Sequence, residues 1–250
     1  MKKIVARLPR WAREFLRKAK NAALSLFYRG ERRFCPVCGR SSRKFRRFGI
    51  DAREDARCAH CGSLERHRFV WLYFRDRTDL FDGAPKTMLH VAPEACFEPR
   101  LKKALGPGYI SADLADPRAM VKLDVTAIPY PDGFFDVIYC SHVLEHVQDD
   151  RRAMRELHRA LKPGGWAILN VPVRVEATVE DPSITDPAGR LAAFGQTDHV
   201  RRYGRDYQDR LREAGFWVMT IGVSDLFGEE DRVRMGLTSA TGDIFYCTKE

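Results

Sequence analysis

The sequence of 250 residues has no long apolar run. No stretch approaches the ~20 consecutive apolar residues that a membrane-spanning helix needs. The Met1-Lys2-Lys3 start is not followed by the continuous apolar segment of a secretory signal. These absences argue against export and predict a cytoplasmic protein. An Arg-rich, acid-poor start also fits an organellar transit peptide, so that alternative stays open.

Acidic residues are scarce near the start of the chain. Residues 1–50 contain 16 Lys or Arg and only 2 Asp or Glu, whereas residues 51–250 contain 27 and 32. A basic arm therefore precedes a mildly acidic body, which predicts that the arm meets an anionic partner. The same asymmetry argues against a body that is one large nucleic-acid-binding surface, and no DNA partner is expected.

The segment 1–30 is predicted to hold a basic amphipathic helix over residues 9–28. Its apolar positions recur at helical spacing: Trp11, Phe15, Leu16, Ala19, Ala23, Leu26 and Phe27. One interpretation is a helix lying on an anionic membrane surface, which would place the protein at the inner face of the membrane, or on RNA. The other is a helix that packs on its own protein with a solvated basic face.

Seven cysteines with no export signal favour a reducing compartment and a metal site over a disulfide framework. Two Cys-x-x-Cys pairs, each followed by glycine, lie 19 residues apart in segment 31–82. This spacing predicts a closed, structural zinc site, with four ligands: Cys35, Cys38, Cys58 and Cys61. A zinc ribbon of this kind, formed by segment 31–82, has two common uses. It stabilises a segment that is too small to bury its own core, or it presents basic side chains to an anionic partner. A helix over 63–80 links the ribbon to the next domain.

From residue 83 to residue 250, strand and helix patterns alternate. The predicted strands cover residues 88–91, 109–112, 121–123, 135–140, 166–171, 216–223 and 244–248, and the predicted helices between them cover 94–105, 149–162 and 204–214. Such alternation predicts an α/β fold, with a Rossmann-like, seven-stranded, mostly parallel sheet and helices on both faces.

The turn after the first of these strands lacks the glycines of a dinucleotide site. This absence argues against NAD or FAD but matters less for S-adenosylmethionine (SAM), which has no pyrophosphate to hold. Glu94 is a candidate acceptor for the ammonium group of SAM. Asp113, 21 residues beyond Ala92, is placed to accept from ribose hydroxyls, with Leu114 beside it. Asp124 is a candidate for the adenine amino group, with Val125 packing on the ring.

Three motifs carry a family resemblance: DVTAIPYPDGFFDVI at 124–138, SHVLEHV at 141–147 and LKPGG at 161–165. Together they closely resemble the class I SAM-dependent methyltransferases. The resemblance implies that Asp113 binds the ribose of SAM and that Asp124 lies beside the adenine. It also implies that Ser141 and His142 line the methionine end of the cofactor. The first-strand motif departs from the family pattern, because His90, Ala92, Glu94 and Cys96 replace an acid and three glycines.

A narrower likeness covers EDPSITDP at 180–187 and FGQTDHVRRYG at 194–204, which resemble bacterial methyltransferases with a cysteine-rich N-terminal extension. We expect a long functional loop here. Candidate proton-transfer residues are His142 and His199, with Asp198 assisting. The candidate acceptor-binding residues are His146, Gln196, Arg201 and Tyr203. The alternative for any one of these histidines is a structural role. The alternative for Arg201 and Tyr203 is that they cap the next helix.

The leading hypothesis is a SAM-dependent methyltransferase acting on a small molecule, glycan or other cell-envelope precursor. An RNA methyltransferase that grips phosphates with the ribbon and the basic arm is the first alternative. A non-catalytic interaction module that keeps the fold without SAM is the second.

Overall fold

The computed structural model describes residues 26–49 and 52–250. All but the last three residues of the helix expected over 9–28 lie outside this range. The described chain forms two compact units. The first ends at Asp76 and also includes Phe227–Thr241, and the second comprises Arg77–Leu226 and Gly242–Glu250. The sequence placed the boundary at residue 82 and gave no sign that residues 227–241 join the first unit.

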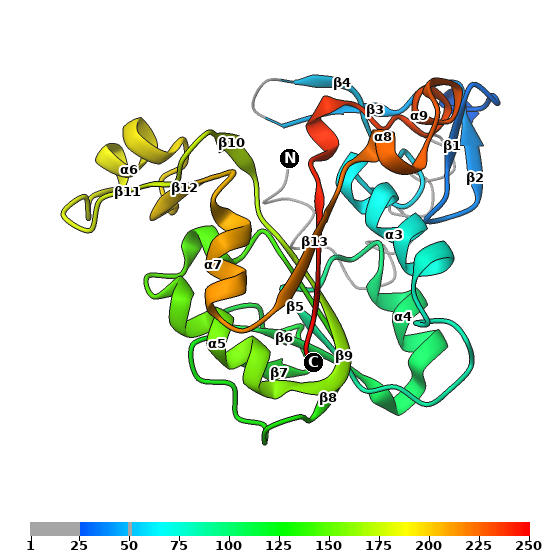
Figure 1. Cartoon of the computed structure of the whole chain (residues 1–250). Coiled ribbons are helices and arrows are strands. Elements are labelled where there is room, and N and C mark those ends of the chain that lie inside the picture. Colours follow the sequence, from blue (N-terminus) through cyan, green and yellow to red (C-terminus); the bar gives the residue numbers. More distant parts are fainter. Residues whose placement is uncertain (1–25, 50–51) are drawn as a thin grey trace, which may run out of the picture. The chain divides into compact units, whose positions relative to one another are not determined.

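The described part of the first unit contains two short hairpins and the helices α3 and α9 (Figure 1). Antiparallel β1 (Arg33–Cys35) and β2 (Arg40–Ser42) form one hairpin, and β3 (Arg46–Phe48) and β4 (Arg53–Arg57) form the other. The long helix is α3 (Glu65–Arg77), where the sequence predicted 63–80. The late segment adds α9 (Glu229–Met235) and a single 3₁₀ turn at Ser239–Thr241.

One buried arginine explains why the late segment joins this unit. Arg68 on α3 has no solvent-exposed surface, and its guanidinium donates to the carbonyls of Ala56, Ser63, Met235 and Gly236 at 2.6–3.1 Å. It also lies over the ring of Phe45, 4.2 Å from the centroid. A buried charge needs this many partners, so the late segment supplies hydrogen bonds that α3 requires.

The second unit contains the predicted seven-stranded sheet, in the order β13-β14-β9-β8-β5-β6-β7. The strands are β5 (Met88–Val91), β6 (Tyr109–Asp113), β7 (Val121–Lys122), β8 (Phe135–Ser141), β9 (Leu161–Asn170), β13 (Trp217–Ile221) and β14 (Ile244–Thr248). β5 to β9 pair in parallel, and β14 is antiparallel to both of its neighbours. The prediction of a mostly parallel, Rossmann-like sheet is therefore confirmed.

Helices cover both faces of this sheet, as Figure 1 shows, with α4 on one side and α5 and α7 on the other. Their bounds are α4 (Glu98–Leu105), α5 (Asp150–Ala160), α7 (Tyr207–Glu213) and the short α8 (Val223–Leu226), with 3₁₀ turns at Gly106–Gly108 and Leu144–His146. α4 begins four residues later than predicted, because residues 94–97 form a turn first. α5 ends at Ala160, and β9 begins at Leu161, five residues before the predicted strand.

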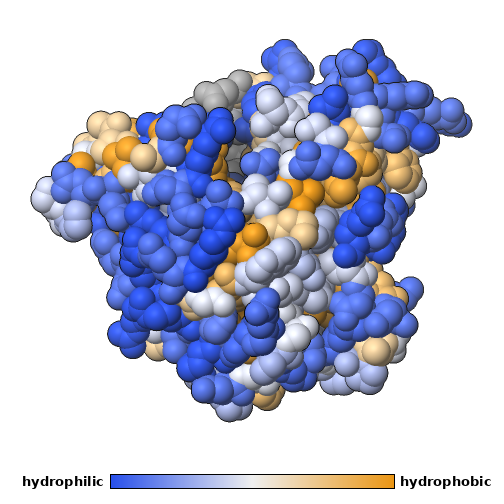
Figure 2. Space-filling model, in the orientation of Figure 1, coloured by the Kyte–Doolittle hydropathy of each residue, from blue (hydrophilic) through white to orange (hydrophobic). Residues whose placement is uncertain are grey.

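The core of the second unit lies under the central strands. All four residues of β5 are buried, as are Val137 to Ser141 of β8 and Trp166 to Asn170 of β9. Parallel strands covered on both faces are expected to be continuously apolar, and His90 interrupts this pattern within β5. The edge strand β13 differs, since Trp217 and Met219 are exposed, and Figure 2 shows apolar surface along this strand.

The segment after β9 is folded, where the sequence predicted a loop without secondary structure. A three-stranded sheet in the order β10-β12-β11 forms from Val173–Val175, Arg201–Gly204 and Val179–Glu180. α6 (Pro187–Phe194) lies between β11 and β12. Asp186 caps α6 by accepting from the amide of Gly189, and left-handed Gly195 ends it. Among the helices of the described ranges, none is long and apolar enough to cross a bilayer.

Candidate functional site

The ligand-binding edge of the second unit is fixed by its strand order. β5 pairs with β6 on one side and β8 on the other, so the chain turns in opposite directions from this point. Ligands of open α/β sheets bind outside the carboxyl ends of the strands at such a switch point. The residues that follow β5, β6, β7 and β8 are therefore the ones to examine.

The loop after β5 begins with a strained residue. Ala92 has φ +51°, although it is not glycine, and its amide donates to the carbonyl of Ala112 on β6 at 2.8 Å. The left-handed region disfavours a residue with a Cβ atom. Non-glycine residues in this conformation concentrate at functional sites. The turn after β5, which has no glycine, therefore adopts a backbone conformation that glycine would take more easily.

A polar cluster lies beneath this loop. The imidazole of His90, fully buried in β5, is 2.8 Å from the Tyr109 hydroxyl and 2.6 Å from Glu94 Oε2. The Tyr139 hydroxyl donates to Glu94 Oε1 at 3.1 Å. Burial raises the pKa of Tyr109, so its hydroxyl keeps its proton. Glu94 is thus tied to the sheet by two contacts, and its role toward an ammonium group stays a prediction.

Asp113 and Asp124 follow the adjacent strands β6 and β7. Asp113 Oδ1 accepts from the amides of Ala115 and Asp116, both at 2.7 Å, and the structure shows no hydrogen bond to its Oδ2 among the described residues. Leu123 donates its amide to the Asp113 carbonyl, which sets the two strand ends side by side. Asp124 is exposed, and its Oδ1 accepts from the Thr126 amide and hydroxyl.

Apolar side chains accompany these two carboxylates. Leu114 is 59% exposed and Met120 is 55% exposed. Val125 is buried next to Asp124. An apolar surface beside two hydrogen-bond acceptors suits a ligand that has a flat ring with an amino group and, next to it, a sugar with hydroxyl groups.

The end of β8 holds a second strained residue and an unpaired hydroxyl. Ser141 is buried, and its Oγ has no hydrogen-bond partner among the described residues. His142 has φ +57°, and its amide donates to the Asn170 carbonyl at 2.8 Å. Its Nδ1 lies 3.3 Å from Glu145 Oε1. A buried polar atom without a partner requires an explanation, and a ligand supplies one.

Two further histidines gather near the end of β8. His146 lies after this strand and His199 just before β12, and their rings meet edge to face with centroids 4.7 Å apart. Asp198 Oδ2 is 3.4 Å from His146 Nδ1. Burial lowers the pKa of His199, which is 6% exposed. The structure thus brings the candidates His146, Asp198 and His199 together, and Glu145 completes a cluster that the sequence did not single out.

Arg201 and Tyr203 are not available to an acceptor. Arg201 is buried and donates to the carbonyls of Leu144, Val147 and Gln148 and to the Glu180 carboxylate. The fully buried Tyr203 hydroxyl donates to Asp150 Oδ2 at 2.6 Å. Their predicted acceptor-binding role is corrected to a structural one, since both anchor the three-stranded sheet. Gln196 is exposed after α6.

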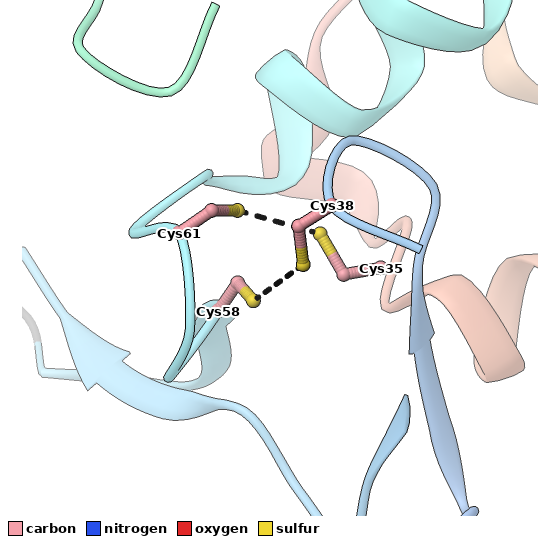
Figure 3. Close-up of side chains that lie close together, drawn as sticks. All are labelled: Cys35, Cys38, Cys58 and Cys61. Carbon is pink, nitrogen blue, oxygen red and sulfur yellow. Dashed lines mark hydrogen bonds between the residues drawn. The ribbon is translucent and has the colours of Figure 1, made fainter. Parts of the chain in front are cut away.

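The four cysteines of the paired motifs converge in the first unit (Figure 3). Cys35 and Cys61 sulfurs are 3.7 Å apart, and Cys38 and Cys58 sulfurs are 3.8 Å apart. Four sulfurs at tetrahedral positions about 2.3 Å from one zinc ion lie about 3.8 Å from each other. The same distances are far longer than a disulfide bond. The cluster therefore fits a tetrahedral metal ion.

The turns that carry these cysteines follow the expected design. Gly39 and Gly62 are left-handed, at φ +68° and +78°, and their amides donate to the Cys35 and Cys58 carbonyls. The Ser63 hydroxyl lies 3.1 Å from Cys35 Sγ and 3.2 Å from Cys61 Sγ. His67 accepts from the Leu64 amide at the start of α3, so it is used outside the cluster.

Comparison with known proteins gives matches to methyltransferases. A family model described as a methyltransferase domain matches residues 101–169. The 27-O-demethylrifamycin SV methyltransferase of Amycolatopsis mediterranei is 32% identical over 127 residues, which is 47% of this chain and 42% of that protein. The malonyl-[acyl-carrier protein] O-methyltransferase of Halorhodospira halophila is 32% identical over 95 residues, 37% of this chain and 30% of that protein. The chain thus spans less than half the length of these curated relatives.

Among solved structures, a SAM-dependent methyltransferase from Mesorhizobium loti aligns with 71% of this chain and 96% of its own, at 15% identity and a TM-score of 0.46. The range that the family model matches begins within α4 and includes β6, β7, β8, α5 and nearly all of β9. Over residues 101–169 the chain is therefore similar to the methyltransferase domain that this family model describes.

Proposed function

We propose that this chain is a SAM-dependent methyltransferase that acts on a small-molecule, glycan or cell-envelope acceptor. The observation that carries the proposal is a set of polar groups that the fold leaves available at one edge of the sheet. Ser141 Oγ is buried without a partner, and Asp113 Oδ2 makes no hydrogen bond among the described residues. Two strained residues, Ala92 and His142, lie at the same edge.

These residues fit the parts of SAM as follows. Asp113 is placed to accept from the ribose hydroxyls, and Asp124 to accept from the adenine amino group. Leu114 and Val125 supply apolar surface for the ring, next to the Ala92 and Glu94 loop. Ser141 and His142 lie at the end of β8, where the methionine part of the molecule would reach. SAM supplies an electrophilic methyl group on a sulfonium.

The protein contributes to the reaction by aligning the methyl donor and acceptor, by excluding water and by accepting a proton. Methyl transfer is an in-line displacement in which positive charge is dispersed, so most of the rate comes from holding donor and acceptor in line. An acceptor hydroxyl or ammonium must also lose a proton. His142 is the best-placed candidate base, because its side chain is 33% exposed and its Nδ1 faces the buried Glu145 carboxylate. Asp198 and His199 lie in the neighbouring cluster.

The cysteine cluster suits structural zinc. Four thiolates complete a tetrahedral shell and leave no position for a substrate. The hairpin strands of the first unit are only three to five residues long, so a metal ion would help to hold the hairpins together. This zinc therefore serves the fold of the first unit, outside the methyl-transfer step.

RNA methylation is the second candidate function. The observation that favours it is the row of basic side chains along the ribbon hairpins, where Arg40, Arg43, Lys44 and Arg47 are exposed. Such a row can neutralise phosphates. The basic arm of residues 1–25 lies outside the described residues, and its membrane or RNA contact stays a prediction.

The test is equilibrium binding of SAM by calorimetry, followed by methyl transfer from labelled SAM to acceptor extracts. Wild-type protein should bind SAM, and Asp113→Ala should weaken binding by roughly tenfold or more, since a hydrogen bond to a charged group contributes about 1.5–3 kcal/mol. Asp132→Asn, an exposed carboxylate paired with Arg159, is the control. Absence of SAM binding by the folded wild-type protein would instead support a non-catalytic module.

A further inference from the structure

A cluster of three side chains beside the proposed methionine end has the composition of a metal site. Glu145 and His146 belong to the 3₁₀ turn after β8, and His199 lies just before β12. One ligand atom from each lies within 4.8 Å of the other two. The Val200 amide donates to the Glu145 carbonyl at 2.9 Å, so the backbone holds the two segments together.

The Glu145 carboxylate is the feature that the protein alone does not explain. Its side chain is 1% exposed, and neither oxygen accepts a hydrogen bond from any described residue. The nearest group that can carry positive charge is His142, with Nδ1 3.3 Å from Oε1. A buried carboxylate that accepts no hydrogen bond, with one part-exposed imidazole as its ion-pair partner, is unfavourable. A missing ion is one of the standard explanations for an unsatisfied buried group.

The two imidazoles are arranged around the same point. His199 is 6% exposed and His146 is about one-third exposed, so the cluster is closed on one side and open on the other. Asp198 orients His146 from outside, with both its carboxylate and its carbonyl oxygen within 3.4 Å of Nδ1. Ligating histidines commonly have a carboxylate or carbonyl on the second ring nitrogen or nearby.

We propose that Glu145, His146 and His199 bind one divalent transition-metal ion. Two imidazoles and one carboxylate form a donor set that such ions accept, with the remaining coordination positions open. Ligand atoms on bonds of about 2.1 Å in a tetrahedral site lie about 3.4 Å apart, so atoms that are now up to 4.8 Å apart must close by as much as about 1.4 Å on binding. In the methyltransferase proposed above, the open positions suit an acceptor that presents hydroxyl or carboxylate oxygens. This assignment of the acceptor class rests on the proposed function, whereas the metal site does not.

Cobalt(II) is the probe, because it reports its ligands by absorption. Full-length protein with zinc in the cysteine cluster is titrated with Co²⁺, and bound metals are counted by elemental analysis after gel filtration. We expect one zinc and one cobalt per chain, without the intense thiolate-to-cobalt absorption that exchange into the cysteine cluster would give. Glu145→Gln and His199→Ala should each weaken cobalt binding by about 100-fold or more, since even loss of an outer partner costs 10–100-fold.

The matched controls are Glu176→Gln, an exposed carboxylate on the same unit, and His60→Ala, a histidine of the ribbon. Both should bind cobalt like the wild type. Because His199→Ala removes a buried ring and can unfold the protein, Glu145→Gln is also followed by thermal unfolding. Without added cobalt, this variant should melt at a higher temperature than wild type, since it removes the buried charge. Added cobalt should raise the melting temperature of the wild type but not that of Glu145→Gln.

The metal site is overturned if folded wild-type protein takes up no cobalt at millimolar concentration. It is equally overturned if both cluster variants bind cobalt as tightly as the wild type. SAM binding is measured on the same samples. Uptake of cobalt by a protein that does not bind SAM supports the metal site and contradicts the methyltransferase function.

Discussion

At the scale of single residues, the carboxyl edge of the sheet contains two departures from ordinary backbone geometry. Ala92 and His142 are left-handed without being glycine, and they follow the neighbouring strands β5 and β8. Each costs conformational energy that the surrounding hydrogen bonds must offset. Both residues lie at the switch point of the sheet, which agrees with a binding site whose loops after β5 and β8 are preorganised for a ligand.

Ala92→Gly tests this strain. Removing the Cβ atom relieves about 1–2 kcal/mol of strain in the folded state. The greater conformational freedom of glycine in the unfolded chain lowers the free energy of unfolding by about 0.4–1 kcal/mol. The expected net result is a free energy of unfolding raised by about 0.5–1 kcal/mol, measured by urea denaturation. A lower stability for the glycine variant would show that the alanine methyl packs favourably and that the strain is small.

The carboxylate of Glu180 provides a prediction about acid stability. Hydrogen bonds from Arg210 and then Arg201 hold its pKa down to about 2. A lowered carboxyl pKa stabilises the folded state above pH ~4.5, and this contribution is lost as the pH falls toward 2. Because the side chain is 38% exposed, solvent screening reduces the effect, and we expect Glu180→Gln to cost about 1–2 kcal/mol at pH 7.

Chemical denaturation at several pH values measures this difference. The difference in free energy of unfolding between wild type and Glu180→Gln should become smaller as the pH falls below about 4.5. Glu176→Gln, whose partner Arg205 is exposed, should show little change at any pH. A gap that stays constant down to pH 3 would mean that Glu180 acts through packing and not through its charge.

At the scale of secondary-structure elements, the hairpins of the first unit are short, and the four cysteines join them. β1 and β2 have three residues each; Cys35 ends β1, Cys38 lies in the turn before β2, and Cys58 and Cys61 follow β4. Strands this short have little stability by themselves. The integrity of the ribbon should therefore depend on its metal, while the sheet of the second unit should not.

Removal of zinc tests that difference. Treatment with a strong chelator, or the variant Cys58→Ser, should abolish hydrogen-exchange protection in β1 to β4 while β5, β8 and β9 keep theirs. Mass spectrometry of peptic fragments measures both regions in one sample. Cys96→Ala, a buried cysteine outside the cluster, should leave the ribbon protected. Ribbon protection that survives complete metal removal would contradict a stapling role.

The elements also show what the sequence could and could not predict. The seven strands and the convergence of the four cysteines were predictable, because buried parallel strands are continuous apolar runs and the Cys-x-x-Cys spacing is local. The folding of residues 173–204 was not, because β10 and β12 pair across a long separation and their support comes from buried ion pairs. Arg201 and Tyr203 look like binding residues in the sequence, and only their burial against Asp150 reveals a structural role.

The metal-site candidate was missed for a similar reason. His146 and His199 were identified separately as candidates, yet 52 positions separate them in the chain. Glu145 resembled an ordinary acidic residue of a surface turn, and nothing local indicated that its carboxylate is buried. The only available signal was its place directly between two candidate residues, His142 and His146, after a buried strand.

At the scale of the whole molecule, charge distinguishes the two candidate acceptor classes. The first 50 residues are strongly basic, so the chain should bind RNA non-specifically at low salt. Under the proposed function, this binding should fall by a factor of 10³ or more between ~50 and ~200 mM salt if several phosphates are contacted. SAM affinity should barely change over the same range. Fluorescence anisotropy with a labelled RNA and calorimetry with SAM measure the two dependences, and RNA binding that persists at 200 mM with sequence preference would favour the RNA alternative.

The most direct measurement is a crystal structure of the full chain with S-adenosylhomocysteine bound. We expect the adenosyl group to lie across the carboxyl ends of β6 and β7, with ribose hydroxyls within hydrogen-bond distance of Asp113. We also expect the thioether sulfur to face the end of β8 near His142. Crystals grown with excess ligand in which this edge stays empty, or in which the ligand lies elsewhere, would contradict the proposed methyl transfer.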